Sequence, residues 1–345
     1  MSLHSEIFEQ PTVLQNLLAN QFQVVQEIAV EIRARGVEYI FLAARGTSDN
    51  AGRYANYLWG AFNRLPTALA TPSLFTLYNR PPSLKNALVV GISQSGESPD
   101  IISVLAEGRR QGSLTLAITN VTDSPLARSA DFVIDIQAGH EAAVAATKTY
   151  TAELMAIAML AVALEGDDSR LRDLEATPAH VEQVLSLDGM IAQVSERYRY
   201  MQQCVVLGRG YNYSTAFEWS LKLKELTYVV AEPYSSADFQ HGPIAMVESG
   251  FPVMAVTPGG MVFDNVFELL TRLKNDYNAE LLVISEKDAA LALSQAPLEL
   301  PQGIPEWLTP LVSIVPAQLF AYHLARAKGY STESPRSIHK VTRTR

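Results

Sequence analysis

The sequence contains a single cysteine, Cys204, among its 345 residues, and it lies in the apolar run "CVVLG". One cysteine excludes a disulfide within the chain and any metal site built from several cysteines. Because an apolar neighbourhood is typical of a core position, we expect Cys204 to be buried and not to act as a nucleophile.

Charge is also sparse, since charged residues make up 18% of the chain and the net charge is −9. This balance argues against a nucleic acid or an anionic membrane as the main partner, but a small anionic substrate needs only a local binding loop. The N-terminal "MSLHSEIFEQP" has no basic segment followed by an apolar one, so we expect no secretory signal. The most apolar stretch, residues 154–164, is too short to span a bilayer and predicts a buried helix. We therefore expect a cytoplasmic protein with no membrane partner.

Motifs for metals and nucleotides are missing from the sequence. No pair of histidine or acidic residues has the spacing of a metal site. "GRGYNYS", residues 208–214, lacks the third glycine of a dinucleotide-binding turn. The hydroxyl-rich loop at 91–100 has no lysine of the P-loop kind. We expect no metal and no cofactor.

Strands and helices alternate along the chain. Residues 13–33 have apolar side chains at helical spacing, which predicts an opening helix. Buried strands are predicted from short apolar runs, with amphipathic or turn-rich segments between them, at 39–44, 87–93, 114–119 and 132–136. This alternation predicts an α/β fold with a parallel sheet covered by helices on both faces.

The second half of the chain repeats this order, with apolar runs at 204–210, 251–260 and 280–285. The predicted strand ends Ala44, Ser93 and Asn120 are 49 and 27 positions apart. Their counterparts Gly208, Thr257 and Ser285 are 49 and 28 positions apart. Two spacings that agree to within one residue indicate two copies of one α/β unit.

The expected organisation is therefore an N-terminal helical segment at 1–34, a first domain at 35–175 and a second at 176–345. The boundary is placed near the charged connector at 165–178. The first copy has "SQSG" where the second has "TPGG", so the copies are not chemically equal. Because ligands bind beyond the carboxyl ends of parallel strands, we expect one ligand site per chain, shared between unlike halves.

The loop "GISQSGESPD", residues 91–100, has the composition of an anion-binding loop. Ser98 is placed to cap a helix whose first residue is Pro99, and a helix start offers free N–H groups and positive dipole density. Hydrogen-bond donors for a phosphate are the side chains of Ser93, Gln94, Ser95 and Ser98, and Gly96 permits positive φ. Taken alone, such a loop is more often a solvated turn with a helix cap. A second hydroxyl-rich loop, Thr47 and Ser48, favours the phosphate site.

Five segments carry a resemblance to a known family. They are "ARGTSDNAGRYA", "ISQSGESPD", "VAATKTYTAEL", "LGRGYNYSTAFEWSLKLKELTYVVAEPYSSADFQHGP" and "SPRSIHKVT". In this order they resemble the tandem sugar-isomerase (SIS) module of the glutamine:fructose-6-phosphate amidotransferases, from about residue 35 to the C-terminus. The glutamine-hydrolysing part of those enzymes has no counterpart here, so we expect a free-standing member, similar to the SIS-type aminosugar-phosphate deaminases.

The resemblance implies proton transfer between C1 and C2 of an open-chain phosphorylated sugar, which needs a base, a ring-opening group and a phosphate anchor. It implies that Glu225 moves the proton and that His241 opens the sugar ring from the neighbouring subunit of a homodimer. It also implies that Lys340 contacts the open-chain carbonyl, either by a hydrogen bond or as an imine. For Glu225 and Lys340 the alternatives are an exposed helix carboxylate and a solvated basic tail.

Further residues follow from the same resemblance. Lys222 falls on the same helix face as Glu225, where it would hold Glu225 ionised. Val144 and Ala146 lie in a segment that resembles the family's sugar-contacting loop. Ala146 stands where the synthases usually have serine, and Arg45 replaces a small residue before the "GTS" turn. Both departures are expected to alter the preferred substrate.

The resulting hypothesis is conversion of glucosamine 6-phosphate to fructose 6-phosphate and ammonia. Alternatives are a synthase-type isomerase supplied with ammonia or with a separate glutaminase, a plain isomerase, and a fructosamine-6-phosphate deglycase. A sensor that binds a phosphorylated sugar without turnover is a further alternative. The sequence fixes neither the sugar epimer, nor an amine substituent, nor the physiological direction.

Overall fold

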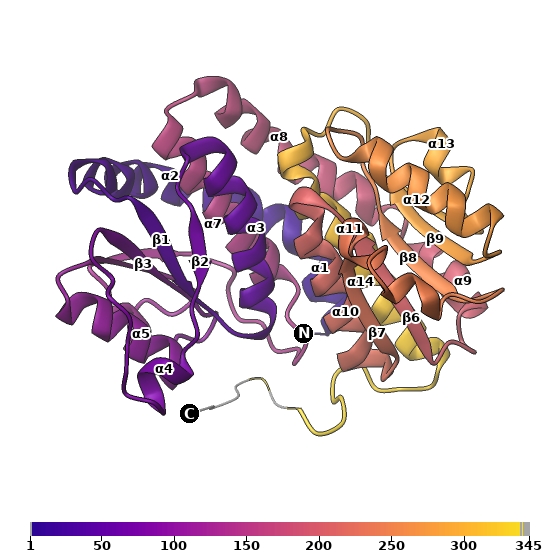
Figure 1. Cartoon of the computed structure of the whole chain (residues 1–345), viewed down its shortest axis with the longest axis horizontal. Helices are drawn as coiled ribbons and strands as arrows, with labels where there is room; N and C mark the ends of the chain where they lie inside the picture. Colours follow the sequence, from indigo (N-terminus) through magenta and orange to yellow (C-terminus); the bar gives the residue numbers. More distant parts are fainter. Residues whose placement is uncertain (1, 339, 341–345) are drawn as a thin grey trace. The chain divides into compact units, whose positions relative to one another are not determined.

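The computed structural model describes residues 2–338 and 340, except for the side chain of residue 168 (Figure 1). The described chain divides into two compact units. The N-terminal unit comprises Glu9–Glu141, Lys148–Glu175 and Lys340. The C-terminal unit comprises residues 2–8, Ala142–Thr147 and Ala176–Ile338. The loop Ala142–Thr147 thus belongs with the C-terminal unit, although both chain segments that flank it belong to the N-terminal unit.

The N-terminal unit is built on one parallel sheet with strand order β2-β1-β3-β4-β5. Its strands are β1 (Tyr39–Ala43), β2 (Thr67–Leu69), β3 (Ala87–Ile92), β4 (Leu114–Thr119) and β5 (Phe132–Asp135). The central strands β3 and β4 are buried along their whole length. Continuous apolar runs form such strands because helices cover both faces of a parallel sheet.

Helices of the N-terminal unit precede, connect or follow these strands, and they pack against the sheet or against one another (Figure 1). They are α2 (Gln10–Ala34), α3 (Gly46–Asn63), α4 (Ser73–Thr76), α5 (Pro99–Arg110), α6 (Pro125–Ser129) and α7 (Lys148–Glu165). Helix α7 contains the apolar stretch 154–164 and is buried almost throughout, as the sequence predicts. Because α7 is apolar on all sides, it lies inside the unit, where it packs against α2 and α3.

The C-terminal unit repeats the same topology, with strand order β10-β9-β8-β6-β7 in a second parallel sheet. Its strands are β6 (Gln203–Gly208), β7 (Val230–Ser235), β8 (Pro252–Val256), β9 (Glu280–Ser285) and β10 (Ala296–Glu299). Strand β6 corresponds to β1, β8 to β3 and β9 to β4. The predicted duplication and the predicted α/β fold are therefore confirmed. Cys204 lies in β6 with 1% of its surface exposed, as expected for a core residue.

The helices of the C-terminal unit include one of unusual composition. They are α1 (Leu3–Phe8), α9 (Asp188–Arg197), α10 (Tyr213–Thr227), α11 (Ser236–Phe239), α12 (Phe263–Asn275), α13 (Asp288–Leu291) and α14 (Thr309–Ala327), with 3-10 turns η1 (Gly210–Asn212), η2 (Pro243–Met246) and η3 (Glu306–Leu308). The segment Glu306–Ala327 is long and apolar enough to cross a membrane, but 94% of its most apolar window is buried inside the protein. A core helix has the same composition, and α14 packs against α10, α9 and α1.

Three strands and one helix differ from the sequence-based expectation. The strands β2, β7 and β10 were not predicted; all three are edge strands, and β7 contains Pro233. Exposed positions interrupt all three strands, β2 has only three residues, and edge strands tolerate proline, so none of the three has the continuous apolar run that marks a central strand. The charged segment 165–178, expected as a connector, is largely helical, because α8 (Asp168–Leu185) begins within it.

Candidate active site

The loops that follow β1 and β3 lie at the topological switch point of the N-terminal sheet. In the order β2-β1-β3-β4-β5, the chain runs to one side after β1 and to the other after β3. Ligands of open α/β sheets bind at this point, beyond the carboxyl ends of the two strands. The guanidinium of Arg45, after β1, donates to the buried carboxylate of Asp100 in the first turn of α5, at 2.7 and 3.2 Å. The two predicted phosphate loops are therefore neighbours.

Backbone hydrogen bonds fix the loop between β3 and α5. The Gly96 N–H donates to the carbonyl and to the hydroxyl oxygen of Ser93, both at 3.2 Å. The carbonyl of Gln94 accepts from the Asn120 N–H at 3.1 Å, and that of Gly96 accepts from the Leu126 N–H at 3.0 Å. The loop is thereby attached to the segments that follow β4, so its polar groups have defined positions.

Gly96 has the positive φ that the sequence predicts, +63°. A Cβ at this position would lie 2.1 Å from the hydroxyl oxygen of Ser124, so no side chain fits without rearrangement. Gly96 therefore meets two requirements at once, a left-handed backbone and a close approach to the neighbouring segment.

The predicted phosphate ligands of this loop differ in exposure. Ser93 is buried, with 7% of its surface exposed, whereas Gln94, Ser95 and Ser98 are half-buried. Helix α5 begins at Pro99, as predicted, and Ser98 occupies the N-cap position with extended backbone. One detail of the prediction is wrong: the Ser98 side chain makes no capping hydrogen bond. Its hydroxyl is therefore not committed to the helix start.

In the second hydroxyl-rich loop, Thr47 and Ser48 form part of the first turn of α3. Thr47 is half-buried. The Ser48 hydroxyl donates to the buried carboxylate of Glu153 on α7 at 2.8 Å, so it faces inward and is less available to a ligand. Of these two predicted phosphate contacts, the geometry favours Thr47.

A buried lysine between two carboxylates dominates the electrostatics of α10. The Lys222 ammonium lies 2.6 Å from a carboxylate oxygen of Glu225 and 3.2 Å from one of Glu218. The exposed fractions of the side chains are 1% for Lys222, 0% for Glu218 and 23% for Glu225. Glu225 is therefore the member of this triad that a substrate can reach. Helical spacing explains the contacts, since the three residues are four and three positions apart.

Burial alone would lower the pKa of Lys222, but its attraction to Glu218 and Glu225 and the hydrogen bonds to them outweigh this effect and raise the pKa above its usual value. Lys222 is consequently a cation at neutral pH. A fixed positive charge at 2.6 Å orients the Glu225 carboxylate.

His241 lies on an exposed turn between α11 and η2, in agreement with the turn that the sequence predicts from the following Gly-Pro. The backbone N–H of His241 donates to the carbonyl of Asp238 at 3.0 Å, and the next residue, Gly242, has φ +136°. The imidazole is thus presented at the surface of the C-terminal unit.

Lys340 has a buried partner. Its ammonium lies 2.5 Å from a carboxylate oxygen of Glu141, a residue with a fully buried side chain. The same carboxylate accepts hydrogen bonds from the Thr149 backbone at 3.2 Å and the Thr149 hydroxyl at 2.7 Å. The side chain of Lys340 is 25% exposed. It is therefore held in a defined place, unlike the side chains of a solvated basic tail.

The loop Ala142–Thr147 carries the other two predicted sugar contacts. Val144 and Ala146 are half-buried, and the residues that alternate with them are buried. The loop is held at its start by the buried carboxylate of Glu6 on α1, which accepts from the N–H groups of Ala142 at 2.5 Å and Ala143 at 3.2 Å. Val144 and Ala146, which the resemblance selects, are more accessible than their immediate neighbours in the chain.

Sequence reasoning missed Glu218 and Glu141, the buried partners of Lys222 and Lys340. Glu218 could have been found, because it precedes Lys222 by four positions on a predicted helix. The pairing of Glu141 with a lysine 199 positions later has no local signal. Lys148, which ends the "VAATK" motif, is buried and donates to Glu9 at 2.5 Å and to the His140 carbonyl at 2.8 Å, so its role is structural.

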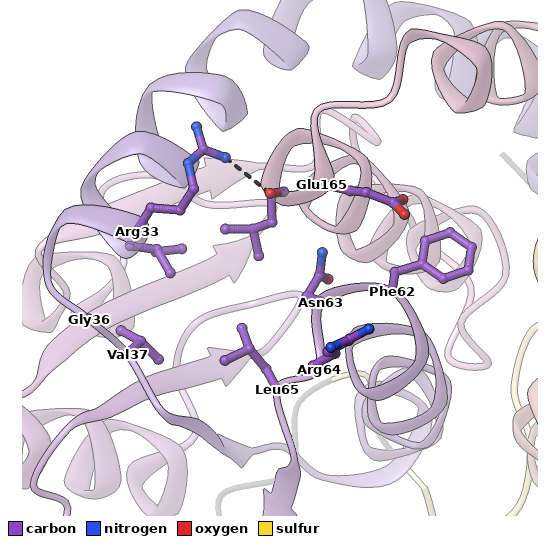
Figure 2. A pocket seen from close by; sticks show the side chains of 10 residues that line it. Arg33, Gly36, Val37, Phe62, Asn63, Arg64, Leu65 and Glu165 are labelled. Atoms are coloured by element: carbon purple, nitrogen blue, oxygen red, sulfur yellow. Dashed lines mark hydrogen bonds between the residues drawn. The ribbon is translucent and has the colours of Figure 1, made fainter.

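One pocket of the N-terminal unit contains none of the predicted site residues. It has a volume of about 480 Å³ and lies where α2, α3 and α7 end (Figure 2). Arg33 lines it, and its guanidinium donates to the carbonyls of Ala163 at 2.8 Å and Leu164 at 3.2 Å. This arginine caps the last turn of α7, so its charge already serves the fold.

The chain is similar to proteins of one family over most of its length. Residues 35–163 and 200–327 match the family described as the SIS domain. A glutamine–fructose-6-phosphate aminotransferase (isomerizing) of Thermus thermophilus is 35% identical in an alignment of 348 positions that covers 97% of this chain and 57% of that protein. The corresponding enzyme of Pectobacterium atrosepticum is 34% identical, over 98% of this chain and 58% of that protein. The chain thus spans little more than half the length of these relatives.

Solved structures of similar proteins have the same fold. The C-terminal domain of glucosamine-fructose-6-phosphate aminotransferase from Francisella tularensis superposes with a TM-score of 0.88 and 30% identity, covering 96% of this chain and 98% of that domain. Glucosamine-6-phosphate deaminase from Thermotoga maritima has a TM-score of 0.76 over both whole chains, but at 19% identity it shows the fold alone. With two matched segments and a duplicated five-stranded sheet, the chain belongs to the SIS domain family.

Proposed function

We propose that this chain is a sugar-phosphate enzyme that moves a proton between C1 and C2, and that its reaction is the conversion of glucosamine 6-phosphate to fructose 6-phosphate and ammonia. The observation that carries the proposal is the Glu218–Lys222–Glu225 triad on α10. It combines a partly exposed carboxylate with a buried cation 2.6 Å away. Buried ion pairs are costly, and one that leaves a single carboxylate accessible suits a base held ready for substrate.

The proposed chemistry begins with the open-chain aldose. The Glu225 carboxylate removes the proton from C2, and the electron pair forms a C1–C2 double bond while the C1 carbonyl oxygen gains a proton. Return of a proton to C1 gives the C2 imine of the ketose. Addition of water to this imine and loss of ammonia give fructose 6-phosphate. The sum is one aminosugar phosphate and one water consumed, and one ketose phosphate and one ammonia released.

In the same proposal, the loop after β3 binds the phosphate through Ser93, Gln94, Ser95 and Ser98, with Thr47 or Ser48 assisting. The support is the position of both loops at the switch point, together with the N-terminus of α5, because a helix N-terminus favours anions. Asp100 lies in that first helical turn, where its charge would repel an anion. Its ion pair with Arg45 offsets this charge.

Three further roles belong to this proposal. His241 opens the sugar ring, and we propose that it serves the site of a second copy in a homodimer. Lys340, held by Glu141, contacts the open-chain carbonyl. Val144 and Ala146 contact the sugar. The exposure of the His241 turn and the partial exposure of the two loop residues support these roles.

The similarity to aminotransferases named "isomerizing" favours one second candidate, isomerisation of a fructose 6-phosphate imine in the synthetic direction. The nitrogen in this direction would come from ammonia, supplied directly or by a glutaminase. Ala146 stands where the synthases usually have serine, which weakens this alternative. A deglycase acting on a fructosamine 6-phosphate would use the same proton transfer, whereas a sensor would have no need for the triad.

The test is to supply purified protein with glucosamine 6-phosphate and to follow ammonia and fructose 6-phosphate together. Equal formation of both products establishes the deaminase. Formation of glucosamine 6-phosphate only when fructose 6-phosphate and ammonium are supplied favours the synthetic direction. If the protein binds these sugar phosphates tightly but turns over none of them, the proposal is wrong and the sensor is favoured.

A further inference from the structure

A histidine from each of two helices faces one aspartate in the C-terminal unit. The Nε2 atom of His4 on α1 lies 3.0 Å from Oδ1 of Asp188, and the Nε2 atom of His323 on α14 lies 2.7 Å from the same oxygen. The three residues are far apart in sequence, with 184 and 135 positions between the bonded pairs. They form the one group of potential metal ligands found among the described residues, with the three ligand atoms within 4.8 Å of one another.

We propose that His4, Asp188 and His323 form a binding site for one divalent first-row transition metal ion. Two imidazole nitrogens and one carboxylate oxygen are a ligand set typical of Zn²⁺, Ni²⁺, Co²⁺ or Fe²⁺. Mg²⁺ and Ca²⁺ prefer sets made of oxygen atoms alone. Both imidazoles present the same nitrogen, Nε2, to one oxygen, so the lone pairs of all three ligands can share one ion when each ring carries its proton on Nδ1.

The distances suit such an ion. With bonds of about 2.1 Å to nitrogen and oxygen, N···O separations of 2.7 and 3.0 Å correspond to N–metal–O angles of roughly 80–90°. These two angles are close to the 90° between adjacent ligands of an octahedral ion, whose remaining positions water can fill. The exposed fractions of the side chains are 33% for His4, 27% for Asp188 and 11% for His323, so an ion can enter from solvent.

The surrounding structure holds both imidazoles in place. The His4 ring packs between Phe8 and Tyr322, with ring centroids 4.7 and 4.9 Å away. Tyr322 also lies against His323, at 4.9 Å. Ligands whose orientation is fixed before binding lose little conformational entropy when the ion arrives.

Two carboxylates fix the short helix that presents His4. Glu333 accepts hydrogen bonds from the Leu3 N–H at 3.1 and 3.2 Å, next to His4 in the chain. The fully buried carboxylate of Glu6, two positions after His4, accepts hydrogen bonds from backbone N–H groups of the 142–147 loop. A six-residue helix would be marginal by itself. These contacts and the buried side chain of Leu3 keep α1 in place, so His4 approaches Asp188 in a defined geometry.

The experiment uses the full chain without a polyhistidine tag, treated with EDTA and then freed of it. Zn²⁺ binding is measured by calorimetry, and Co²⁺ binding by the visible absorption that nitrogen and oxygen ligation produces. We expect saturable binding of one ion per chain, a melting temperature raised by a few degrees with Zn²⁺, and no comparable effect of Mg²⁺.

Variants at the site show whether the ion binds to these two histidines or elsewhere on the chain. His4→Gln and His323→Gln remove one nitrogen ligand each, from different helices, and each is expected to weaken Zn²⁺ binding by at least about 10-fold. His180→Gln on α8 is the matched control and should bind Zn²⁺ like the wild type. Circular dichroism establishes that each variant is folded.

Two outcomes overturn the proposal. One is the absence of saturable Zn²⁺ or Co²⁺ binding to the wild-type chain below about 1 mM, a result that needs no variant. The other is equal Zn²⁺ affinity of the wild type and of both histidine variants, which would place the ion elsewhere. Neither readout involves turnover of a sugar phosphate, so this test is independent of the proposed function.

Discussion

Lys222 and Glu225 are joined by a 2.6 Å ion pair on α10, in which the lysine is buried and the glutamate is the accessible partner. The second carboxylate on Lys222, that of Glu218, is fully buried. The arrangement makes Lys222 necessary for both glutamates. It neutralises a buried charge on one side and orients the proposed base on the other.

Lys222→Met is expected to lower the free energy of unfolding by roughly 3–5 kcal/mol, because it leaves Glu218 buried without its counter-charge. The measurement is urea denaturation of the variant beside the wild type. Lys224→Met is the matched control, since Lys224 lies two positions away on the exposed face of α10 and should change stability little. Equal stability of the Lys222 variant and the wild type would contradict the ion-pair account.

Gly96→Ala tests the phosphate loop. The variant combines a residue other than glycine at φ +63° with a Cβ 2.1 Å from Ser124, so the loop must move. We expect the KM for a phosphorylated substrate to rise at least about 10-fold, because the loop loses its register with the ligand. Gly112→Ala is the control: φ is also positive there, +81°, but no atom lies within 4 Å of the added Cβ. If both variants have the same KM, the loop does not depend on the close approach at Gly96.

Ser95→Ala tests whether the Ser95 hydroxyl binds the phosphate group of the substrate, because it leaves the proposed sugar contacts unchanged. Removing a half-buried hydroxyl at the switch point should weaken binding of the phosphorylated sugar by about 1–2 kcal/mol, close to the value of one hydrogen bond to a charged group. The same change at Ser103, whose hydroxyl donates to the Pro99 carbonyl within α5, should have no such effect. Isothermal titration with fructose 6-phosphate measures both. Unchanged affinity of the Ser95 variant would remove this residue from the proposed site.

The thiol of Cys204 should be unreactive in the folded protein. Burial raises its pKa to about 12, so at neutral pH the thiol stays protonated, and the thiolate is the reactive form. We expect no reaction with a thiol reagent at pH 7.5 in buffer and one equivalent per chain in guanidinium. Stoichiometric modification of the native protein within minutes would show that β6 is accessible or that the unit opens readily.

The sequence predicted the features that depend on local pattern. The central strands appeared as apolar runs, the duplication followed from the spacing of their ends, and the positive φ of Gly96 followed from loop chemistry. The edge strands β2, β7 and β10 were missed, because exposed positions interrupt their apolar side chains. Ser98 was placed at its helix terminus correctly but was given a capping bond that it does not make.

Contacts between distant segments were beyond prediction. The pairing of Lys340 with Glu141, and the meeting of His4 and His323 at Asp188, depend on how helices and loops pack, and no periodicity signals them. The association of Ala142–Thr147 with the C-terminal unit is of the same kind, because it involves hydrogen bonds that the backbone N–H groups of Ala142 and Ala143 donate to Glu6. Val144 and Ala146 were predicted as sugar contacts only through the resemblance to a family, and this role stays a prediction.

The most direct test of the account is the rate of product formation by Glu225→Gln, with whichever sugar phosphate the wild type turns over. The substitution keeps the size of the side chain and removes the base. The account predicts that kcat falls at least about 100-fold while the affinity for fructose 6-phosphate changes little, because the phosphate contacts lie on another loop. Turnover by the variant at the wild-type rate would show that Glu225 does not move the proton.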